Sequence, residues 1–193
     1  ENVAVMRIIS GRFKGATLAS VGKGDARAHL RPTMDRVRES IFNLLANGGY
    51  SDPISNARVL DLFAGTGALG FEALSRGASF VQFVDNQRKA GVLISGNAEM
   101  LCVQSQIKLL RRDARKLGRW NEKPFALVFL DPPYGKAMGE KALEASLAGG
   151  WLAQEALIVW EENREQGCPA GFKMLDARKY GETWVHILEV NAA

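Results

Sequence analysis

The chain of 193 residues is 47% hydrophobic and 24% charged, which is enough apolar material for one sizeable core with a short extension. No segment approaches the ~18 apolar residues of a membrane span, so we expect a cytoplasmic protein rather than an integral membrane protein. Cys102 and Cys168 fit no metal-ligand spacing and are too few for a disulfide framework, and His29 and His186 are isolated; we therefore expect no metal site.

Positive charge is concentrated in two segments, although the net charge is only +4. Residues 1–38 hold eight Lys and Arg against three acids, and residues 108–123 hold seven against two. Basic patches of this kind are the electrostatic footprint of a phosphate-backbone partner. For the second segment, a purely solubilising surface is an equal alternative.

The first elements predicted are a small hairpin and a helix. Residues 6–9 and 16–19 flank a basic turn, which indicates a β-hairpin that must either pack on the main domain or become ordered on binding. A helix is expected from Met34 to Asn47, with Thr33 as its N-cap and its apolar residues on one face. Arg36 and Arg38 lie off that face, so we expect them to face solvent or a phosphate.

From residue 58 onwards, strand-like and helical segments alternate. Strands are expected at 58–63, 80–84, 107–110, 125–130 and 156–161, and helices at 67–76, 87–101, near 114 and at 137–147. This alternation is typical of an α/β fold with a mostly parallel, doubly wound sheet. Residues 172–179 and 183–190 follow without an intervening helix, which predicts a closing antiparallel hairpin and a sheet of seven strands.

The sequence Asp131-Pro132-Pro133-Tyr134 follows the apolar run at 125–130. The two prolines have no N–H to donate and a fixed φ, so they end the strand abruptly and hold the Asp131 carboxylate, the Pro132 carbonyl and the Tyr134 ring at its carboxyl end. In open α/β sheets, ligands bind at this edge. Two acceptors and a flat aromatic ring suit a planar group with an exocyclic NH2. An ordinary turn with a half-buried tyrosine is an equal alternative for this stretch alone.

A glycine-rich loop follows the strand at 58–63 and opens a helix. Gly65 permits a tight turn and Gly67 lets a ligand approach the backbone, with the helix N-terminus aimed at a negatively charged ligand group. Asp85, at the end of the next strand, is placed to bind the two ribose hydroxyls of an adenosine cofactor. Asp113, after the third strand, can accept from an adenine amino group.

The loop Gly65-Thr-Gly-Ala-Leu-Gly70 also satisfies the dinucleotide pattern G-x-G-x-x-G, so a nicotinamide oxidoreductase is an alternative. Asp61 argues against it, because a carboxylate would repel a pyrophosphate but can bind an ammonium group. S-adenosylmethionine carries such an ammonium group, together with a carboxylate that suits the helix N-terminus. An acid that only caps the loop backbone is the structural alternative for Asp61.

Together these motifs resemble the RsmD family of Rossmann-like S-adenosylmethionine-dependent methyltransferases, from about Met6 to the C-terminal hairpin. The motifs that carry the resemblance are Arg7-Ile-Ile-Ser-Gly-Arg12, Arg31-Pro-Thr-Met-Asp-Arg-Val-Arg-Glu39, Asp61-Leu-Phe-Ala-Gly-Thr-Gly-Ala-Leu-Gly70, Glu72-Ala-Leu-Ser-Arg76, Asp131-Pro-Pro-Tyr134 and Gly150-Trp-Leu-Ala153. The resemblance implies methylation of the amino group N2 of a guanine in bacterial 16S ribosomal RNA. It implies S-adenosylmethionine as the cofactor and the small (30S) ribosomal subunit, or its assembly intermediate, as the partner.

Three sets of site residues are expected on this basis. At the target base we expect Asp131, Pro132 and Tyr134. At the cofactor we expect Asp61, Phe63, Ala64, Gly65, Gly67, Asp85, Asn86, Asp113 and Ala114. At the RNA backbone we expect Arg7, Arg12, Lys14, Arg31, Thr33, Arg36 and Arg38. Residues 1–32 are expected to form a basic β-hairpin extension that contacts RNA, and residues 33–193 the methyltransferase domain of a monomeric enzyme.

A guanine amino group is a poor nucleophile, so the expected task of the enzyme is orientation, which can be worth about 7–11 kcal/mol. Asp131 and the Pro132 carbonyl would accept both amino hydrogens, and Tyr134 would stack on a base taken out of its helix. The motif alone does not separate guanine N2 from adenine N6 or cytosine N4, or RNA from DNA. An adenine-N6 methyltransferase acting on DNA or RNA, and a non-catalytic ribosome-assembly factor, are the alternatives.

Overall fold

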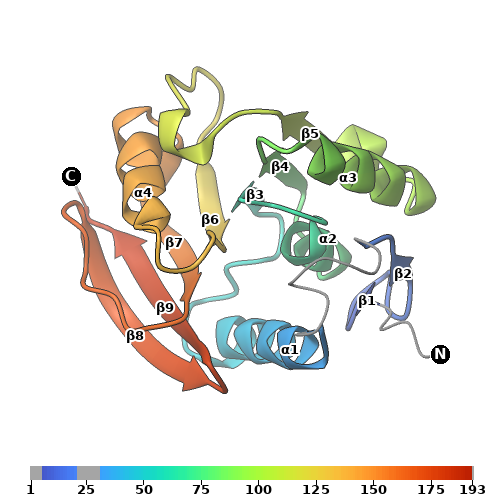
Figure 1. Ribbon diagram of the computed structural model, residues 1–193, viewed down its shortest axis with the longest axis horizontal. Helices are drawn as coiled ribbons and strands as arrows, with labels where there is room; N and C mark the ends of the chain where they lie inside the picture. The colour runs from blue at the N-terminus through green and yellow to red at the C-terminus, as the bar shows by residue number, and fades with distance from the viewer. Residues whose placement is uncertain (1–5, 21–30, 193) are drawn as a thin grey trace.

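A seven-stranded sheet forms the centre of the computed structural model, which describes residues 6–20 and 31–192, with the side chains of 31–34 outside this description (Figure 1). The strand order is β5-β4-β3-β6-β7-β9-β8, in which the first five strands are parallel and β9 runs antiparallel to both of its neighbours. The strands are β3 (Arg58–Leu62), β4 (Phe80–Val84), β5 (Ile107–Leu110), β6 (Phe125–Leu130), β7 (Leu152–Glu162), β8 (Phe172–Tyr180) and β9 (Thr183–Val190).

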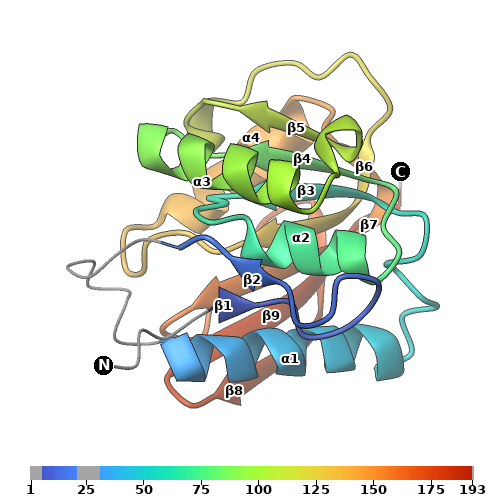
Figure 2. The ribbon, with the colours of Figure 1, turned by 90° about the vertical axis from the view of Figure 1, so that its right-hand side faces the viewer.

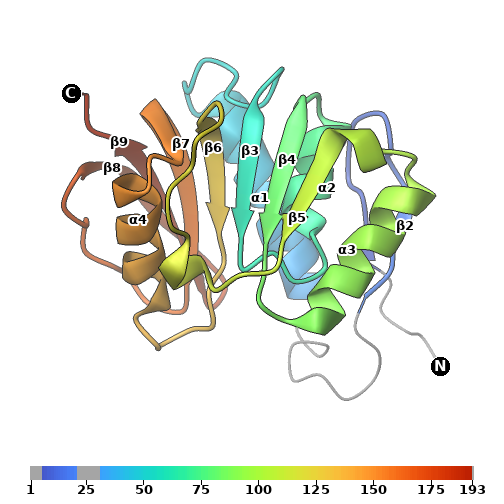
Figure 3. The same ribbon diagram turned by 90° about the horizontal axis from the view of Figure 1, so that it is seen from above.

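Helices cover both faces of this sheet, so that a core forms on each side. The helices are α1 (Arg31–Asn47), α2 (Ala68–Ser75), α3 (Arg88–Met100) and α4 (Met138–Ala148), and two short 3-10 turns are η2 (Gln104–Gln106) and η3 (Ala114–Lys116). In Figure 3, α4 lies in front of the sheet and α1 behind it. Side chains of α1, α2 and α3 share one core cluster, and those of α4 and η3 share the other. None of the helices in the described part of the chain is long and apolar enough to cross a membrane.

The predicted α/β fold is confirmed, with differences at the ends of two elements. Helix α1 begins at Arg31, so Thr33 lies inside its first turn and does not cap it as predicted. Pro32 is tolerated there because the first N–H groups of a helix have no partner within the helix. Strand β7 begins at Leu152 and not at 156, and its register with β6 shifts between Phe125 and Leu127. This bulge interrupts the regular pattern from which the strand was predicted.

The N-terminal hairpin packs on α1 and α2 and shares their core. Its strands β1 (Met6–Arg7) and β2 (Thr17–Leu18) pair antiparallel. Ile8 and Leu18 are buried in the same core cluster as the helices, and Figure 2 shows the hairpin lying across α1 and α2. The apolar side chains of the hairpin therefore belong to the core of the main sheet. The division of the chain at residue 32 stays a prediction.

Glu72 of α2 holds the hairpin in place. Its side chain is completely buried, and its two carboxylate oxygens accept from the backbone N–H groups of Ile9 at 2.8 Å and Ser10 at 3.0 Å. Arg76 Nε donates to the same carboxylate at 2.8 Å, and Arg38 Nε lies 3.9 Å from it. A buried charge is tolerated only when it is paired and hydrogen-bonded in this way. Glu72 thus fixes the backbone of the hairpin at Ile9 and Ser10, and Ser75 of the same helix binds Ser10 and Phe13.

We expect the Glu72→Ala variant to lose about 3–5 kcal/mol of unfolding free energy, because the N–H groups of Ile9 and Ser10 and the Arg76 guanidinium lose a buried carboxylate partner. Urea denaturation measures the loss. Glu144→Ala, which removes an exposed glutamate of α4, is the matched control and should stay within about 0.5 kcal/mol of the wild type. Equal stabilities of the two variants would show that the Glu72 contacts contribute nothing net.

Candidate active site

A cavity of about 150 Å³ opens at the carboxyl ends of the parallel strands. Four neighbouring strands each place an acid there, since Asp61 lies within β3 and Asp85, Asp131 and Glu161 lie at the ends of β4, β6 and β7. The strand order β4-β3-β6-β7 sets the order of these acids along the sheet edge. Ligands bind at this edge in open α/β sheets, so the predicted location of the site is where the structure has its cavity.

The glycine-rich loop after β3 contains residues with positive φ, a backbone conformation that favours glycine. Gly67 has φ 78°, and a Cβ atom added to it would lie 2.7 Å from the Phe71 ring, so a larger residue cannot occupy this position. At Gly65 such an atom would meet nothing closer than 4.0 Å, which leaves its backbone open to the cavity. Phe63 has φ 56° and lines the cavity; strain of this kind costs about 1–3 kcal/mol and clusters at ligand sites.

Asp85 binds the loop backbone with both carboxylate oxygens. One oxygen accepts from Gly65 N–H at 2.9 Å and the other from Gln87 N–H at 2.8 Å. The carboxylate therefore holds the loop after β3 against the end of β4. It also lines the cavity, and its binding of ribose hydroxyls stays a prediction.

Asp61 is buried and performs the loop-capping role that was the structural alternative. Its Oδ2 accepts from Gly70 N–H at 3.0 Å, and the residue is 2% exposed. Burial raises the pKa of Asp61 well above its ordinary value, and the charges of Asp131 and Asp85 raise it further, whereas the Gly70 hydrogen bond lowers it. Capping and ligand binding are compatible, because a carboxylate accepts several hydrogen bonds and Asp61 also lines the cavity.

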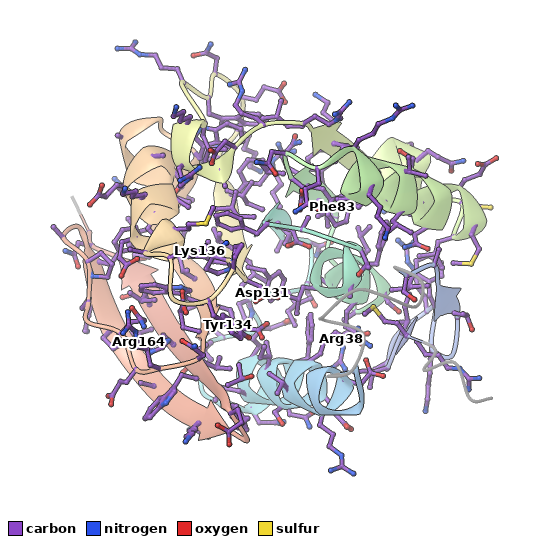
Figure 4. All side chains as sticks on the ribbon, viewed as in Figure 1. Arg38, Phe83, Asp131, Tyr134, Lys136 and Arg164 are labelled. Atoms are coloured by element: carbon purple, nitrogen blue, oxygen red, sulfur yellow. The ribbon has the colours of Figure 1, made fainter. Side chains whose placement is uncertain are left out.

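The Asp131-Pro-Pro-Tyr turn follows directly on β6, which ends at Leu130. Asp131 lines the cavity and Pro132 is buried. Tyr134 is 39% exposed and lies beside Asp131 in Figure 4, outside the residues that line the cavity. Its hydroxyl is hydrogen-bonded with Thr183 of β9, and burial together with the charge of Asp131 raises the pKa of Tyr134. The phenol thus stays neutral and its ring remains accessible.

Glu161 is a cavity residue that was not predicted as part of the site. It follows Trp160, which pairs with Leu130, so it lies beside Asp131 at the sheet edge. Burial raises the pKa of Glu161 well above its ordinary value, Asp131 and Asp61 add to the shift, and Arg38 opposes it. The signal was present in the sequence, because Glu161 ended a predicted strand just as Asp131 followed one.

Arg38 lies in the cavity wall and not on the solvent-facing side of α1. Its side chain is 5% exposed and lies 3.1 Å from Asp35, and it donates to the Arg7 carbonyl. Its Nε has no hydrogen-bond partner among the described residues. Burial lowers the pKa of Arg38, while Asp35, Glu72 and Glu161 raise it. The expectation that it faces solvent is wrong, because helical periodicity cannot show that the hairpin covers this side of α1.

The other predicted residues fall into two groups. Ala64 and Gly65 line the cavity. Gly67, the N-cap of α2, is not a lining residue, and neither are Asn86, Asp113 and Ala114. The Asp113 carboxylate caps η3 and pairs with Arg115 at 2.7 Å. The exposed cations are Arg7, Arg12 and Lys14 on the hairpin and Arg36 on α1. The side chains of Arg31 and Thr33 lie outside the described part of the chain.

Carboxyl groups outnumber cations in the cavity. The charged side chains that line it are Asp61, Asp85, Asp131, Glu161, Arg38 and Lys89. An excess of acids, some of them with raised pKa values, favours a ligand that carries positive charge. No group of three or more His, Cys, Asp or Glu residues within 6–20 and 31–192 is arranged to hold a metal ion.

Comparisons with known proteins agree with this geometry. The model of the family described as conserved hypothetical protein 95 matches residues 6–189. The Bacillus subtilis protein YlbH is 38% identical over 94% of this chain and 97% of its own length. Ribosomal RNA small subunit methyltransferase D of Escherichia coli K12 is 36% identical over 85% of this chain and 78% of its own length. The solved structure of yhhF from Escherichia coli, 33% identical, superposes with a TM-score of 0.80 and covers 98% of this chain and 99% of that chain.

We expect the Asp61→Asn variant to be more stable than the wild type at neutral pH. A carboxyl group whose pKa is raised in the folded state lowers stability as the pH rises from its unfolded value of about 3.9 through the folded one, and asparagine keeps an acceptor for Gly70 N–H. The gain should be absent in acid, grow through that pH range and then stay constant, as followed by urea unfolding at a series of pH values. Asp176→Asn on β8 serves as the control, and a pH-independent difference at Asp61 would contradict the expectation.

Proposed function

Because the chain belongs to the RsmD family of Rossmann-like methyltransferases, we propose that it transfers a methyl group from S-adenosylmethionine to the amino group N2 of a guanine in small-subunit ribosomal RNA. The observation that carries the proposal is the row of acids at the sheet edge, in which Asp131 of the Asp-Pro-Pro-Tyr turn lies next to the cofactor-type loop of β3. We place the reaction in the cytoplasm, on the small (30S) subunit or an assembly intermediate, and expect the enzyme to act as a monomer.

The residues of the β3 and β4 side fit S-adenosylmethionine. Asp61 would bind the ammonium group, the open backbone at Gly65 and the N-terminus of α2 would receive the carboxylate, and Asp85 would bind the ribose hydroxyls. When bound, the cofactor supplies a methyl group on a sulfonium, which is a good leaving group. Positive charge on the ligand would also stabilise the ionised forms of the buried acids.

The residues after β6 orient the target base. Asp131 and the Pro132 carbonyl accept the two amino hydrogens, which directs the nitrogen lone pair away from them and towards the methyl group. The ring of Tyr134 stacks on the base, and a stacked base gains about 1–3 kcal/mol, which offsets much of the few kcal/mol needed to take a base out of its helix. The proton leaves after methyl transfer, when the amino group has become a strong acid.

The exposed cations of the hairpin bind the RNA backbone. Met6 and Ser20, at the two ends of the hairpin, line the cavity, so the exposed Arg7 next to Met6 is the hairpin cation nearest in sequence to the place where the base must enter. Arg12 stacks over Phe13 at 4.5 Å and donates to Gln106, just before β5, at 2.7 Å. Its N–H donates to the Ser75 carbonyl at the end of α2, so the turn of the hairpin lies towards the opposite edge of the sheet from the cavity, where it would bind RNA at a distance from the target base. Phosphate contacts of this kind position an RNA without reading its sequence.

The direct test is incubation with radiolabelled S-adenosylmethionine and three substrates: small subunits lacking the modification, naked 16S RNA and duplex DNA. Labelled N2-methylguanine from the subunit digest is the expected result. Labelled methyladenine from DNA would instead identify an adenine methyltransferase, and the absence of label from all three would support a non-catalytic binding protein.

We expect Asp131→Ala to lower the rate of methyl transfer at least about 10³-fold, since orientation is worth about 7–11 kcal/mol, and to leave cofactor affinity nearly unchanged. Single-turnover kinetics and calorimetric titration with the cofactor measure the two effects. Asp176→Ala, which removes a carboxylate from β8, is the control. Normal turnover by the Asp131 variant would eliminate the proposed role.

We expect the double variant Arg12→Ala plus Lys14→Ala to bind RNA more weakly and with a smaller salt dependence. Each lost phosphate contact reduces the slope of log affinity against log salt by about 0.7–0.9, so the slope should fall by about 1.5. Filter binding at several salt concentrations measures it. Lys141→Ala plus Lys173→Ala, which removes two exposed lysines from α4 and β8, should leave the slope unchanged; equal slopes in both double variants would mean that the hairpin cations are only solubilising.

A further inference from the structure

Among the acids of the described residues that line the cavity, Glu161 is the one to which the mechanism above gives no role. It lies at the end of β7, beside Asp131 at the end of β6, because Trp160 and Leu130 are paired in register one position earlier. Both side chains line the same cavity. The strand order β4-β3-β6-β7 places Glu161 on the far side of Asp131 from Asp85, so it belongs to the half of the cavity where the target base is expected.

The residues around Glu161 also place it in the half of the cavity where the target base is expected. The ring of Tyr134 would stack on the base. The charges of Asp131 and Glu161 both raise the pKa of Tyr134, which is hydrogen-bonded with Thr183 on β9, the next strand beyond β7. Figure 4 shows Asp131 between Tyr134 and Arg38. A base held at Asp131 and stacked on Tyr134 would therefore have a second carboxyl group along its edge.

The ring atoms next to the amino group differ among the bases in whether they donate or accept a hydrogen bond. The amino group of guanine has the N1–H donor next to it, whereas the amino group of adenine lies between the acceptors N1 and N7, and that of cytosine lies beside the acceptor N3. An ionised carboxylate offers only acceptors. A carboxylate beside Asp131 is therefore satisfied by guanine and left facing a ring acceptor by adenine or cytosine, which is costly for buried polar groups.

We propose that Glu161 accepts a hydrogen bond from N1–H of the target guanine and thereby selects guanine over adenine and cytosine. This inference rests on the proposed function and supplies the distinction between amino groups that the Asp-Pro-Pro-Tyr turn by itself does not make. Asp131 and Asp61 face Glu161 with like charge and Arg38 with opposite charge. Arg38, together with a cationic cofactor, favours the ionised form of Glu161 that has no donor for adenine.

A substrate analogue removes the partner of Glu161 without removing the reacting group. 2-Aminopurine keeps the amino group at C2 but has no hydrogen on N1. We would place guanine or 2-aminopurine at the target position of the same small-subunit RNA and measure kcat/KM for each. The wild type should prefer guanine by roughly 10- to 100-fold, the discrimination typical of a specific base contact.

The variant Glu161→Gln should reduce this preference to within about threefold, because an amide can present either its oxygen to N1–H or its NH2 to an N1 acceptor. Glu155→Gln is the control: it makes the same change on an exposed glutamate at the other end of β7. The control should keep the wild-type preference. Cofactor affinity and urea unfolding of both variants establish that they fold and bind the cofactor.

The outcomes separate the two proposals. If the wild type methylates guanine and the preference is the same in Glu161→Gln as in the wild type, Glu161 does not read the base and the inference is overturned. A loss of cofactor affinity in Glu161→Gln with an unchanged preference overturns it as well, and assigns Glu161 to the cofactor. If the wild type methylates no guanine in small-subunit RNA, the proposed function itself fails.

Discussion

The main physical constraint on the cavity is that four carboxyl groups lie close together in its lining. Burial and the charge of Asp131 raise the pKa values of Asp61 and Glu161, so keeping these two carboxyl groups ionised works against the stability of the fold. Such groups are retained where a ligand compensates them. A sulfonium and an ammonium group on one ligand supply that compensation, so the same acids that destabilise the free protein would favour cofactor binding. The strained backbone at Phe63 likewise costs stability at a position that lines the ligand cavity.

The N-terminal hairpin, which we propose to bind RNA, is joined to the cavity through α2 and α3. Glu72 holds the hairpin by two backbone hydrogen bonds and also pairs with Arg38, whose guanidinium lines the cavity. At the other end of the hairpin, Asn97 of α3 accepts from Ala19 N–H at 2.7 Å and donates to the Thr66 carbonyl of the glycine loop at 3.2 Å. The hairpin is therefore positioned against the cofactor loop by buried contacts, which suits an enzyme that must bring one base of a large RNA to one methyl group.

Most of the fold and part of the site could be predicted from local patterns. The apolar runs of β3, β4 and β6 and the turn residues after them are sufficient to place Asp61, Gly65, Asp85 and Asp131 at the ends of strands, and the parallel topology then brings these ends together. Asp113 shows the limit of that argument, because the structure has its carboxylate paired with Arg115 outside the cavity lining. Its position after a strand was correctly predicted, but the partner of a side chain is not part of a strand pattern.

The sequence by itself determined the elements and the chemistry of the groups at their ends, since apolar periodicity, proline and glycine act through the local backbone. The tertiary structure decided which of these groups face each other. Strand order made Glu161 the neighbour of Asp131, although 30 positions of chain separate them, and the docking of the hairpin turned Arg38 from a surface cation into part of the cavity wall. Contacts of this kind depend on packing between distant segments, whose energy no local pattern contains.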